Sequence, residues 1–326
     1  MQTAGVRRDG TVRFIDTEGL KSLRDPTLGP WRLGEDRLLR GARLGWTPES
    51  PLVRRRPLSS LEEAQGLFDA YRAAWEADVG SPEPYEVVEL PIGYGVVVAY
   101  VPGMQMNLHI GFGSYTPEEA GTELGALARR LREVPCDVGI DWGDRYRSWA
   151  RGLARLLPAA LGEKLVHLAD DIPETRVLLH GDLHTGNMVV SHGVVKLVDL
   201  ESLGYGHPLL ELATMRSRLW YNNVHAGLRR GFGLEQSEGM ARTMWDAALR
   251  AYLSQEDDDE LASIDDCAAV LAEVEHCCFK FGIGHLGKEP LTERQLRRAG
   301  LCAERLAALL PTIDRLDAEP QDPRSP

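Results

Sequence analysis

The sequence predicts an α+β protein with two lobes, a small β-rich lobe at residues 1–101 and a large, mainly helical lobe at residues 102–316. Short segments rich in valine and tyrosine, bounded by proline and glycine, close the first lobe and are typical of strands. Longer segments with apolar residues at helical spacing dominate the second lobe. One β-rich segment, residues 177–199, interrupts those helices. We expect residues 317–326, DAEPQDPRSP, to form a disordered tail.

The composition is that of an ordinary soluble, folded protein. The 326 residues are 43% hydrophobic and 26% charged, and a chain of this length can form one large or two modest domains with their own cores. The formal net charge of −12 argues against a nucleic-acid partner, because nucleic-acid binding needs a basic surface. An acidic protein suits a cationic substrate, but many soluble proteins are equally acidic.

Several features predict a cytoplasmic protein without a membrane partner. The longest uncharged apolar run, residues 94–101, is too short to cross a bilayer. The amino terminus, MQTAGVRRDG, lacks the apolar core of a signal peptide. The five cysteines are scattered, and their odd number argues against a disulfide framework and for a reducing compartment. No C-x-x-C or zinc-ligand spacing is present, so a structural zinc site is not expected.

In the small lobe we expect short strands around one helix. The strands are expected at residues 12–15, 38–39, 52–56, 85–90 and 94–101. The helix is expected at residues 59–78, because a serine can cap its start and two glutamates suit its first turn. Gly41 and Gly45 lie between two of the strands, where bare backbone could approach a phosphate. An ordinary hairpin turn explains these glycines equally well.

The large lobe is expected to be built from helices. The clearest start signal is Thr116-Pro117-Glu118-Glu119, in which a capping threonine is followed by a proline and two acids. We expect this helix to end near Pro135. The other helices are expected at residues 144–168, 208–230, 236–254, 258–283 and 292–310. The acidic residues within 256–266 are interpreted as a solvated helix cap rather than as a contact for a cationic acceptor substrate.

The segment that organises the chain is HGDLHTGN, residues 180–187, which follows an apolar run and is called the HGD loop below. It holds Asp182 and, five positions later, Asn187. Two β-rich pieces joined by a Ser-His-Gly turn come next, and the second piece ends at Asp199. A hairpin that folds back after Asn187 would bring Asp199 beside it.

Phosphoryl transfer needs the groups that this segment supplies. One carboxylate orients the attacking hydroxyl and accepts its proton, while an amide and a second carboxylate hold the magnesium ions that neutralise the phosphates. Magnesium prefers hard oxygen ligands and keeps several waters. Asp182 therefore suits the role of the base, and Asn187 and Asp199 suit the role of metal ligands.

Other interpretations of the segment explain less of it. A serine hydrolase is disfavoured because the sequence has no G-x-S-x-G elbow. A metal cluster of His180, Asp182 and His184 would leave Asn187 unexplained. A polar turn that holds an acid and an amide by chance is the remaining alternative.

Four stretches carry a resemblance to a known family: HGDLHTGN, Leu197-Val198-Asp199, Gly206-His207-Pro208 and Glu211-Leu212-Ala213. They resemble the aminoglycoside phosphotransferase and choline kinase superfamily, whose members typically carry HGDLHPGN, a strand ending in I-D, then G-D-P and D-L-A. The Gly-His-Pro form looks like a bacterial subgroup of uncharacterised phosphotransferases. The resemblance implies a two-lobed protein-kinase-like fold. It also implies phosphate transfer from ATP or GTP, with Mg²⁺, to a hydroxyl group of a small molecule.

The resemblance implies roles for residues of the small lobe. The strand that leads into V-P-G is similar to the hinge of the family, where the backbone of Ala99, Tyr100 and Val101 would face adenine. The strand lysine that grips phosphate in relatives is absent, so Arg54 or Arg55 would take its role. Arginine can hold phosphate at two points, but it is not interchangeable with lysine.

The resemblance also implies supporting residues. The helix glutamate that pairs with the strand cation in relatives falls near Leu67 here, and the nearest glutamate is Glu63. In the large lobe, His180 would brace the HGD loop, Glu211 would brace the fold, and His184 would shape the pocket.

The departures in the small lobe keep a second interpretation open, a catalytically weak nucleotide-binding or regulatory protein with the same fold. Transfer of another group, such as a nucleotidyl group, from the same site is a third. The sequence does not predict the acceptor, the choice between ATP and GTP, or the oligomeric state.

Overall fold

The structure, a computed structural model, describes residues 2–6, 12–16, 52–53, 58–90, 93–99, 101–221, 234–254, 258–281 and 293–313. The chain divides into two compact units. The first unit combines Met1–Met104 with Val189–Glu201, and the second combines Gln105–Met188 with Ser202–Pro326. The architecture is α+β, as the sequence predicts. The lobe boundaries stay a prediction, and the first unit takes in a segment from the middle of the chain.

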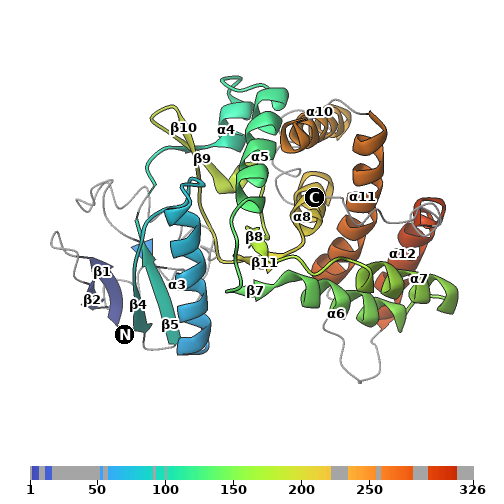
Figure 1. Cartoon of the computed structure of the whole chain (residues 1–326), viewed down its shortest axis with the longest axis horizontal. Helices are drawn as coiled ribbons and strands as arrows, with labels where there is room; N and C mark the ends of the chain where they lie inside the picture. The colour runs from blue at the N-terminus through green and yellow to red at the C-terminus, as the bar shows by residue number, and fades with distance from the viewer. Residues whose placement is uncertain are drawn as a thin grey trace. The chain divides into compact units, whose positions relative to one another are not determined.

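Within the described residues, the first unit combines antiparallel strands with a long helix (Figure 1). The strands are β1 (Gln2–Val6), β2 (Val12–Asp16), β3 (Leu52–Val53), β4 (Pro84–Leu90) and β5 (Gly93–Val98). Strand β1 pairs with β2, and β5 lies between β3 and β4 in a second sheet. Helix α3 (Leu61–Glu76) runs alongside β4 and β5 (Figure 1). Its buried face consists of residues at helical spacing, namely Ala64, Leu67, Ala70, Tyr71 and Ala74.

Local hydrogen bonds fix the start of α3. The side chain of Ser60 accepts a hydrogen bond from the N–H of Glu63 at 3.1 Å. In return, the Glu63 carboxylate accepts hydrogen bonds from the N–H and the hydroxyl of Ser59, both at 2.9 Å. These bonds satisfy amide groups that a helix start otherwise leaves unpaired. Glu63 is therefore engaged at the exposed helix start, and Leu67 is buried.

The middle segment contributes a hairpin. Strands β9 (Met188–Ser191) and β10 (Val194–Leu197) are joined by His192 and Gly193, whose φ angles are 50° and 79°. Positive φ at both central positions is the geometry of a type I′ turn, which suits the twist of paired strands. Strand β9 also neighbours β6 (Met104–Gln105) in the order β10-β9-β6.

Backbone contacts hold the hairpin within the first unit. The N–H of Leu197 donates to the carbonyl of Gly80 at 2.9 Å, and the N–H of Leu200 donates to the hydroxyl of Tyr71 at 3.3 Å. At Gly103, φ is 141°, and a Cβ would lie 2.3 Å from a main-chain oxygen of β9. Glycine is needed there, since any side chain would push the two backbones apart.

The second unit is mainly helical. A small sheet has the strand order β7 (Ile140–Asp141), β11 (Gly204–Gly206) and β8 (Val177–Leu179). The helices are α4 (Met106–Gly111), α5 (Pro117–Arg132), α6 (Trp142–Ala154), α7 (Ala159–Asp170), α8 (Pro208–Tyr221), α10 (Leu234–Leu253), α11 (Asp258–Phe281) and α12 (Glu293–Ala307). Helix α8 packs against α11, α10 and α5, so it lies at the centre of this unit (Figure 1).

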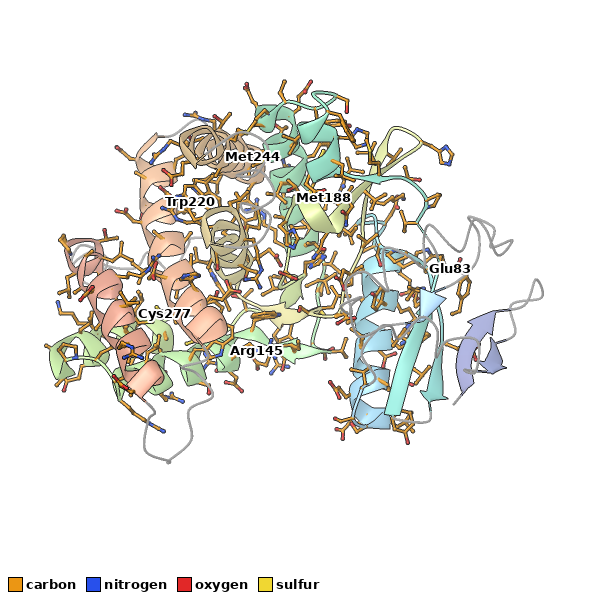
Figure 2. The ribbon with its side chains drawn as sticks, turned by 180° about the vertical axis from the view of Figure 1, so that it is seen from behind. Glu83, Arg145, Met188, Trp220, Met244 and Cys277 are labelled. Atoms are coloured by element: carbon orange, nitrogen blue, oxygen red, sulfur yellow. The ribbon has the colours of Figure 1, made fainter. Side chains whose placement is uncertain are left out.

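Aromatic side chains of α6 form one end of the core of the second unit. The rings of Tyr146 and Trp149 pack edge to face with centroids 5.1 Å apart, and Trp142 packs edge to face against Trp149 at 6.2 Å. The guanidinium of Arg145, labelled in Figure 2, lies over Trp142 at 4.7 Å. Apolar residues of α11 and α12 complete the cluster, among them Cys277, also labelled in Figure 2.

Two glycines let α5 and α10 approach closely. A Cβ at Gly121 would lie 2.2 Å from the carbonyl oxygen of Met244, and one at Gly125 would lie 2.0 Å from that of Ala248. Small residues one turn apart allow two helix backbones to meet, which larger side chains would prevent. Among the described helices, none is long and apolar enough to cross a membrane.

The prediction of one helix over residues 144–168 is wrong. The structure has two helices there, α6 and α7, with Pro158 as the residue before α7. Proline has no N–H to donate, and its ring clashes with the preceding helical turn, so a helix cannot continue through it. The strand expected at residues 94–101 is also shorter, since β5 ends at Val98.

Some predictions fall outside the described residues. They concern the strand at residues 38–39, the turn at Gly41 and Gly45, the arginines Arg54 and Arg55, the hinge residue Tyr100, and the tail at 317–326.

Candidate active site

The HGD loop begins with a sharp turn at the end of β8. Gly181 has a φ of 70°, a conformation that glycine adopts without strain. A Cβ at this position would lie 2.0 Å from the ring of Trp142. The indole N–H of Trp142 donates to the carbonyl of Ser202 at 3.1 Å, which fixes the ring against the turn. The turn therefore depends on glycine for both its conformation and its space.

A buried glutamate braces this turn from α8. Oε2 of Glu211 accepts hydrogen bonds from the N–H groups of His180 at 2.5 Å and Gly181 at 3.1 Å. Burial raises the pKa of Glu211 to about 7, and the two N–H groups act against that rise. Nδ1 of His180 lies 3.3 Å from the N–H of Asp182, which donates to it. The bracing role predicted for His180 is confirmed, and Glu211, which was predicted to brace the fold, does so at this turn.

The loop closes on itself between Asn187 and Asp182. The short 3₁₀ turn η1 (Thr185–Asn187) brings the side chain of Asn187 back, and its Nδ2 donates to the carbonyl oxygen of Asp182 at 2.9 Å. The same Nδ2 lies 3.5 Å from Oδ2 of Asp182. Because an amide nitrogen must face that carbonyl, Oδ1 of Asn187 points elsewhere. Within the described residues, this oxygen makes no hydrogen bond.

The carboxylate of Asp182 is paired with a buried arginine. Nε of Arg218, on α8, donates to Oδ1 of Asp182, and Nη2 of Arg218 lies 3.1 Å from Oε1 of Glu275 on α11. Burial alone would raise the pKa of Asp182, but the positive charge of Arg218 and its hydrogen bond to Asp182 outweigh burial and lower this pKa. Asp182 is therefore ionised at neutral pH.

His184 lies half-buried beside this carboxylate, with 14% of its side chain exposed. Its Nδ1 accepts a hydrogen bond from the N–H of Gly186 at 3.0 Å, and its Nε2 lies 3.9 Å from Oδ1 of Asp182. Burial lowers the pKa of His184 to about 4, although the charge of Asp182 opposes the shift. The imidazole is thus neutral at physiological pH and shapes the loop rather than carrying charge.

Asp199 lies in the first unit, two residues after β10. Its φ angle is 59°, in the left-handed region that aspartate and asparagine tolerate better than most residues. Its side chain is exposed. The structure thus brings Asp182 and Asn187 together in the second unit and presents Asp199 at the end of the hairpin in the first.

The predicted hinge is described only in part. The N–H of Ala99 donates to the carbonyl of Glu83 at 2.8 Å, so it is engaged within the first unit. Val101 makes no hydrogen bond among the described residues. The N–H of Ala99 is therefore already engaged, and the hinge role of Ala99, Tyr100 and Val101 stays a prediction.

A comparison with known sequence families decides what kind of protein this is. The profile of the phosphotransferase enzyme family matches residues 33–248, which is more than half of the chain. The chain belongs to this family. The resemblance to the aminoglycoside phosphotransferase and choline kinase superfamily is thereby confirmed. A search of curated protein sequences finds no match.

Solved structures share the fold of this family member. A complex of an amicoumacin kinase with AMP-PNP, Ca²⁺ and Ami matches with a TM-score of 0.54 and 15% identity, over 82% of this chain and 86% of that chain. A choline/ethanolamine kinase family protein from Mesorhizobium loti matches with a TM-score of 0.50 and 17% identity, over 83% and 89%. At these identities the likeness concerns the fold, and it confirms the predicted two-lobed, protein-kinase-like architecture.

The donor set of this phosphotransferase fits a hard cation. Magnesium takes carboxylate and amide oxygens, and Oδ1 of Asn187 is an amide oxygen without a hydrogen-bond partner in the described structure. The carboxylate of Asp199 is the predicted second ligand, and it is exposed. The residue types therefore agree with the metal that the sequence predicts.

Sequence reasoning missed Arg218 and Glu275. Arg218 lies 36 positions after Asp182, and Glu275 lies on another helix, so no local spacing links them to the HGD loop. One signal was present, since a buried helix rarely carries charges without partners. Arg216 and Arg218 interrupt the otherwise apolar end of α8. Arg216 pairs with Asp265, one of the acids that the sequence analysis interpreted as a solvated cap.

Proposed function

We propose that the protein transfers the γ-phosphoryl group of ATP or GTP to a hydroxyl group of a small molecule, with Mg²⁺. The observation that carries the proposal is the ionised carboxylate of Asp182, held by Arg218 and set beside Asn187 within one loop. A carboxylate in this setting can orient a hydroxyl group and accept its proton as the phosphoryl group arrives.

Each residue of the site has a defined task in this proposal. Asp182 positions the acceptor hydroxyl and takes its proton. Asn187 and Asp199 would hold magnesium, which when bound neutralises charge on the phosphates. Val101, together with Ala99 and Tyr100, would face the base of the nucleotide, and Arg54 or Arg55 would bind its phosphates.

Family membership and the names of similar folds support this function. The chain belongs to a phosphotransferase family. The two similar structures are named as an amicoumacin kinase and a choline/ethanolamine kinase family protein, and the first of them binds AMP-PNP. These names favour a nucleoside triphosphate as the donor and a small molecule as the acceptor. We expect a cytoplasmic protein with neither a nucleic-acid nor a membrane partner.

One observation favours the alternative of a catalytically weak nucleotide-binding protein. Leu67, at the position of the helix glutamate in relatives, is buried and apolar, and Glu63 is engaged by Ser59 at the helix start. The ion pair that helps to place phosphates in kinases is then absent from these positions. This alternative predicts nucleotide binding without phosphate transfer.

Transfer of labelled phosphate from ATP or GTP to a panel of amino alcohols, sugars and aminoglycosides tests the function. We expect the parent protein to phosphorylate one class, and Asp182→Asn to lose at least ~10²-fold in rate while nucleotide binding is retained. Asp170→Asn, which removes a surface charge paired with Arg151 at 2.8 Å, is the control and should keep the parent rate. An Asp182→Asn variant as active as the parent contradicts the assignment. A parent that binds nucleotide but transfers nothing favours the alternative.

A further inference from the structure

Three charged side chains contact one another in a row, one from the HGD loop, one from α8 and one from α11. Arg218 lies between Asp182 and Glu275, and the exposed fractions of the three side chains are 6%, 31% and 0%. Removing a guanidinium and a carboxylate from water is unfavourable unless they pair with opposite charges. Each of these charges therefore depends on its partner, so the position of Arg218 constrains that of Asp182.

The two oxygens of Asp182 have different surroundings. Oδ1 accepts from Nε of Arg218 and lies 3.9 Å from Nε2 of His184. Oδ2 has only the Nδ2 of Asn187 near it among the described residues, at 3.5 Å, which is longer than an ordinary hydrogen bond. Oδ1 is therefore tied down, and Oδ2 is the oxygen with unused acceptor capacity.

We propose that Arg218 is a positioning residue for Asp182: it fixes Oδ1, so that Oδ2 is presented to the acceptor hydroxyl, and Glu275 holds the other end of the guanidinium. The inference rests on the proposed function, because it assumes that Asp182 is the base. Arg218 would act through Asp182 and need not touch the substrate.

The chemistry of arginine suits this role better than that of lysine. The guanidinium is planar and always charged, and it presents donors in a fixed fork. One edge reaches Asp182 on the HGD loop and another reaches Glu275 on α11, so two elements define the orientation of the fork. A lysine can supply the charge, but its single ammonium group cannot fix two carboxylates in the same way.

The chain offers a second ion pair on α11 for comparison, in which the arginine is partly exposed. Glu273 lies two positions before Glu275 on α11 and is also buried. Arg305 of α12 contacts it with Nε at 2.5 Å and Nη2 at 2.8 Å. Neither residue of this pair is in contact with Asp182 in any described interaction. Breaking this second pair should lower stability without changing the orientation of Asp182.

The test measures phosphate release from magnesium–ATP with water as the acceptor, in the full chain. The double variant Arg218→Gln/Glu275→Gln removes both buried charges together, so that neither is left buried without the other. We expect kcat to fall about 10²-fold, as misplacement of a reacting group by about 1 Å does, while KM for ATP stays within about twofold. Arg218→Lys should be faster than the double variant, because it restores a positive charge beside Oδ1.

The control Glu273→Gln should melt at a lower temperature and keep the kcat of the parent. A double variant with the parent kcat overturns the inference, as does a lysine variant as fast as the parent, because the positive charge alone is then sufficient. A Glu273→Gln variant that loses as much kcat as the double variant also overturns it, because the loss is then one of general stability. A parent that transfers phosphate from neither magnesium–ATP nor magnesium–GTP, to water or to any compound of the hydroxyl panel, contradicts the proposed function itself, so the two failures are distinguishable.

Discussion

The buried carboxyl group of Glu211 makes the stability of the folded protein depend on pH. Oε2 holds two N–H groups of the HGD loop, whereas Oε1 is buried without a hydrogen-bond partner among the described residues. Burial raises the pKa of this carboxyl group to about 7 from an ordinary value of 4.5. The folded protein therefore binds this proton more tightly than the unfolded chain does. The resulting stability is present below pH 4.5 and is lost as the pH rises towards 7.

Glu211→Gln should remove this pH dependence. The amide oxygen of glutamine can still accept from the loop, and glutamine carries no charge at any pH. Between pH 5 and pH 8 we expect the free energy of unfolding of the parent to fall relative to that of the variant, by at most on the order of 3 kcal/mol. Urea unfolding at the two pH values measures it. Glu293→Gln, at a side chain that is 83% exposed, is the control and should follow the parent. An equal pH dependence in parent and Glu211→Gln would refute the explanation.

The residues that the sequence could identify lie within one continuous segment. Asp182 and Asn187 were found from the chemistry and spacing of the HGD loop, and Glu211 was found from the resemblance to the family. Arg218 and Glu275 could not be found in this way, because only the packing of α8 against α11 brings them to the loop. The side-chain network around the base is thus a property of the tertiary structure.

At the scale of elements, local chemistry predicted where helices begin. The capping box at the start of α5 is formed as expected, with Thr116 Oγ1 accepting from the N–H of Glu119 at 3.1 Å and the Glu119 carboxylate accepting from the N–H of Thr116 at 2.8 Å. The prediction failed at Pro158, because the apolar spacing continues across the break between two helices. Apolar periodicity alone therefore overestimates helix length.

Two helical glycines should respond to alanine in opposite directions. At Gly125 a Cβ would lie 2.0 Å from the backbone of α10, so Gly125→Ala should push α5 and α10 apart and destabilise the protein by about 1–3 kcal/mol. At Gly300, in α12, no atom lies within 4 Å of the added Cβ. Gly300→Ala should therefore stabilise by about 0.5–1 kcal/mol, as alanine favours a helix over glycine. Urea unfolding of both variants measures the difference. If Gly125→Ala is as stable as Gly300→Ala, the close contact between the helices is not as described.

At the scale of the whole molecule, the residues of the proposed function belong to both units. Asp182 and Asn187 belong to one unit and Asp199 to the other. The sequence predicted the hairpin itself, but it could not show that the hairpin joins the first unit. That membership depends on hydrogen bonds to Gly80 and Tyr71, more than 100 positions earlier in the chain.

Asp199→Asn should make nucleotide binding independent of magnesium. Asparagine tolerates the left-handed backbone at this position, and the change removes the negative charge that would attract magnesium. In thermal-shift titrations, we expect the stabilisation by ATP to lose its dependence on magnesium. Asp78→Asn is a matched control, since Asp78 is exposed, lies in the same unit and has a φ of 51°. Magnesium dependence that is unchanged in Asp199→Asn would refute the metal role.

The discontinuous first unit also has a consequence for the order of events during synthesis. The hairpin at residues 189–201 completes this unit, yet the ribosome makes it long after residue 104. At typical elongation rates of about 5–20 residues per second, the nascent first unit waits on the order of 5–20 s for its last strands. During that interval Gly80 and the hydroxyl of Tyr71 lack the backbone N–H groups that they later accept from. Nascent chains stalled before residue 189 should therefore be cleaved by protease more readily in the first unit than chains stalled well beyond residue 201.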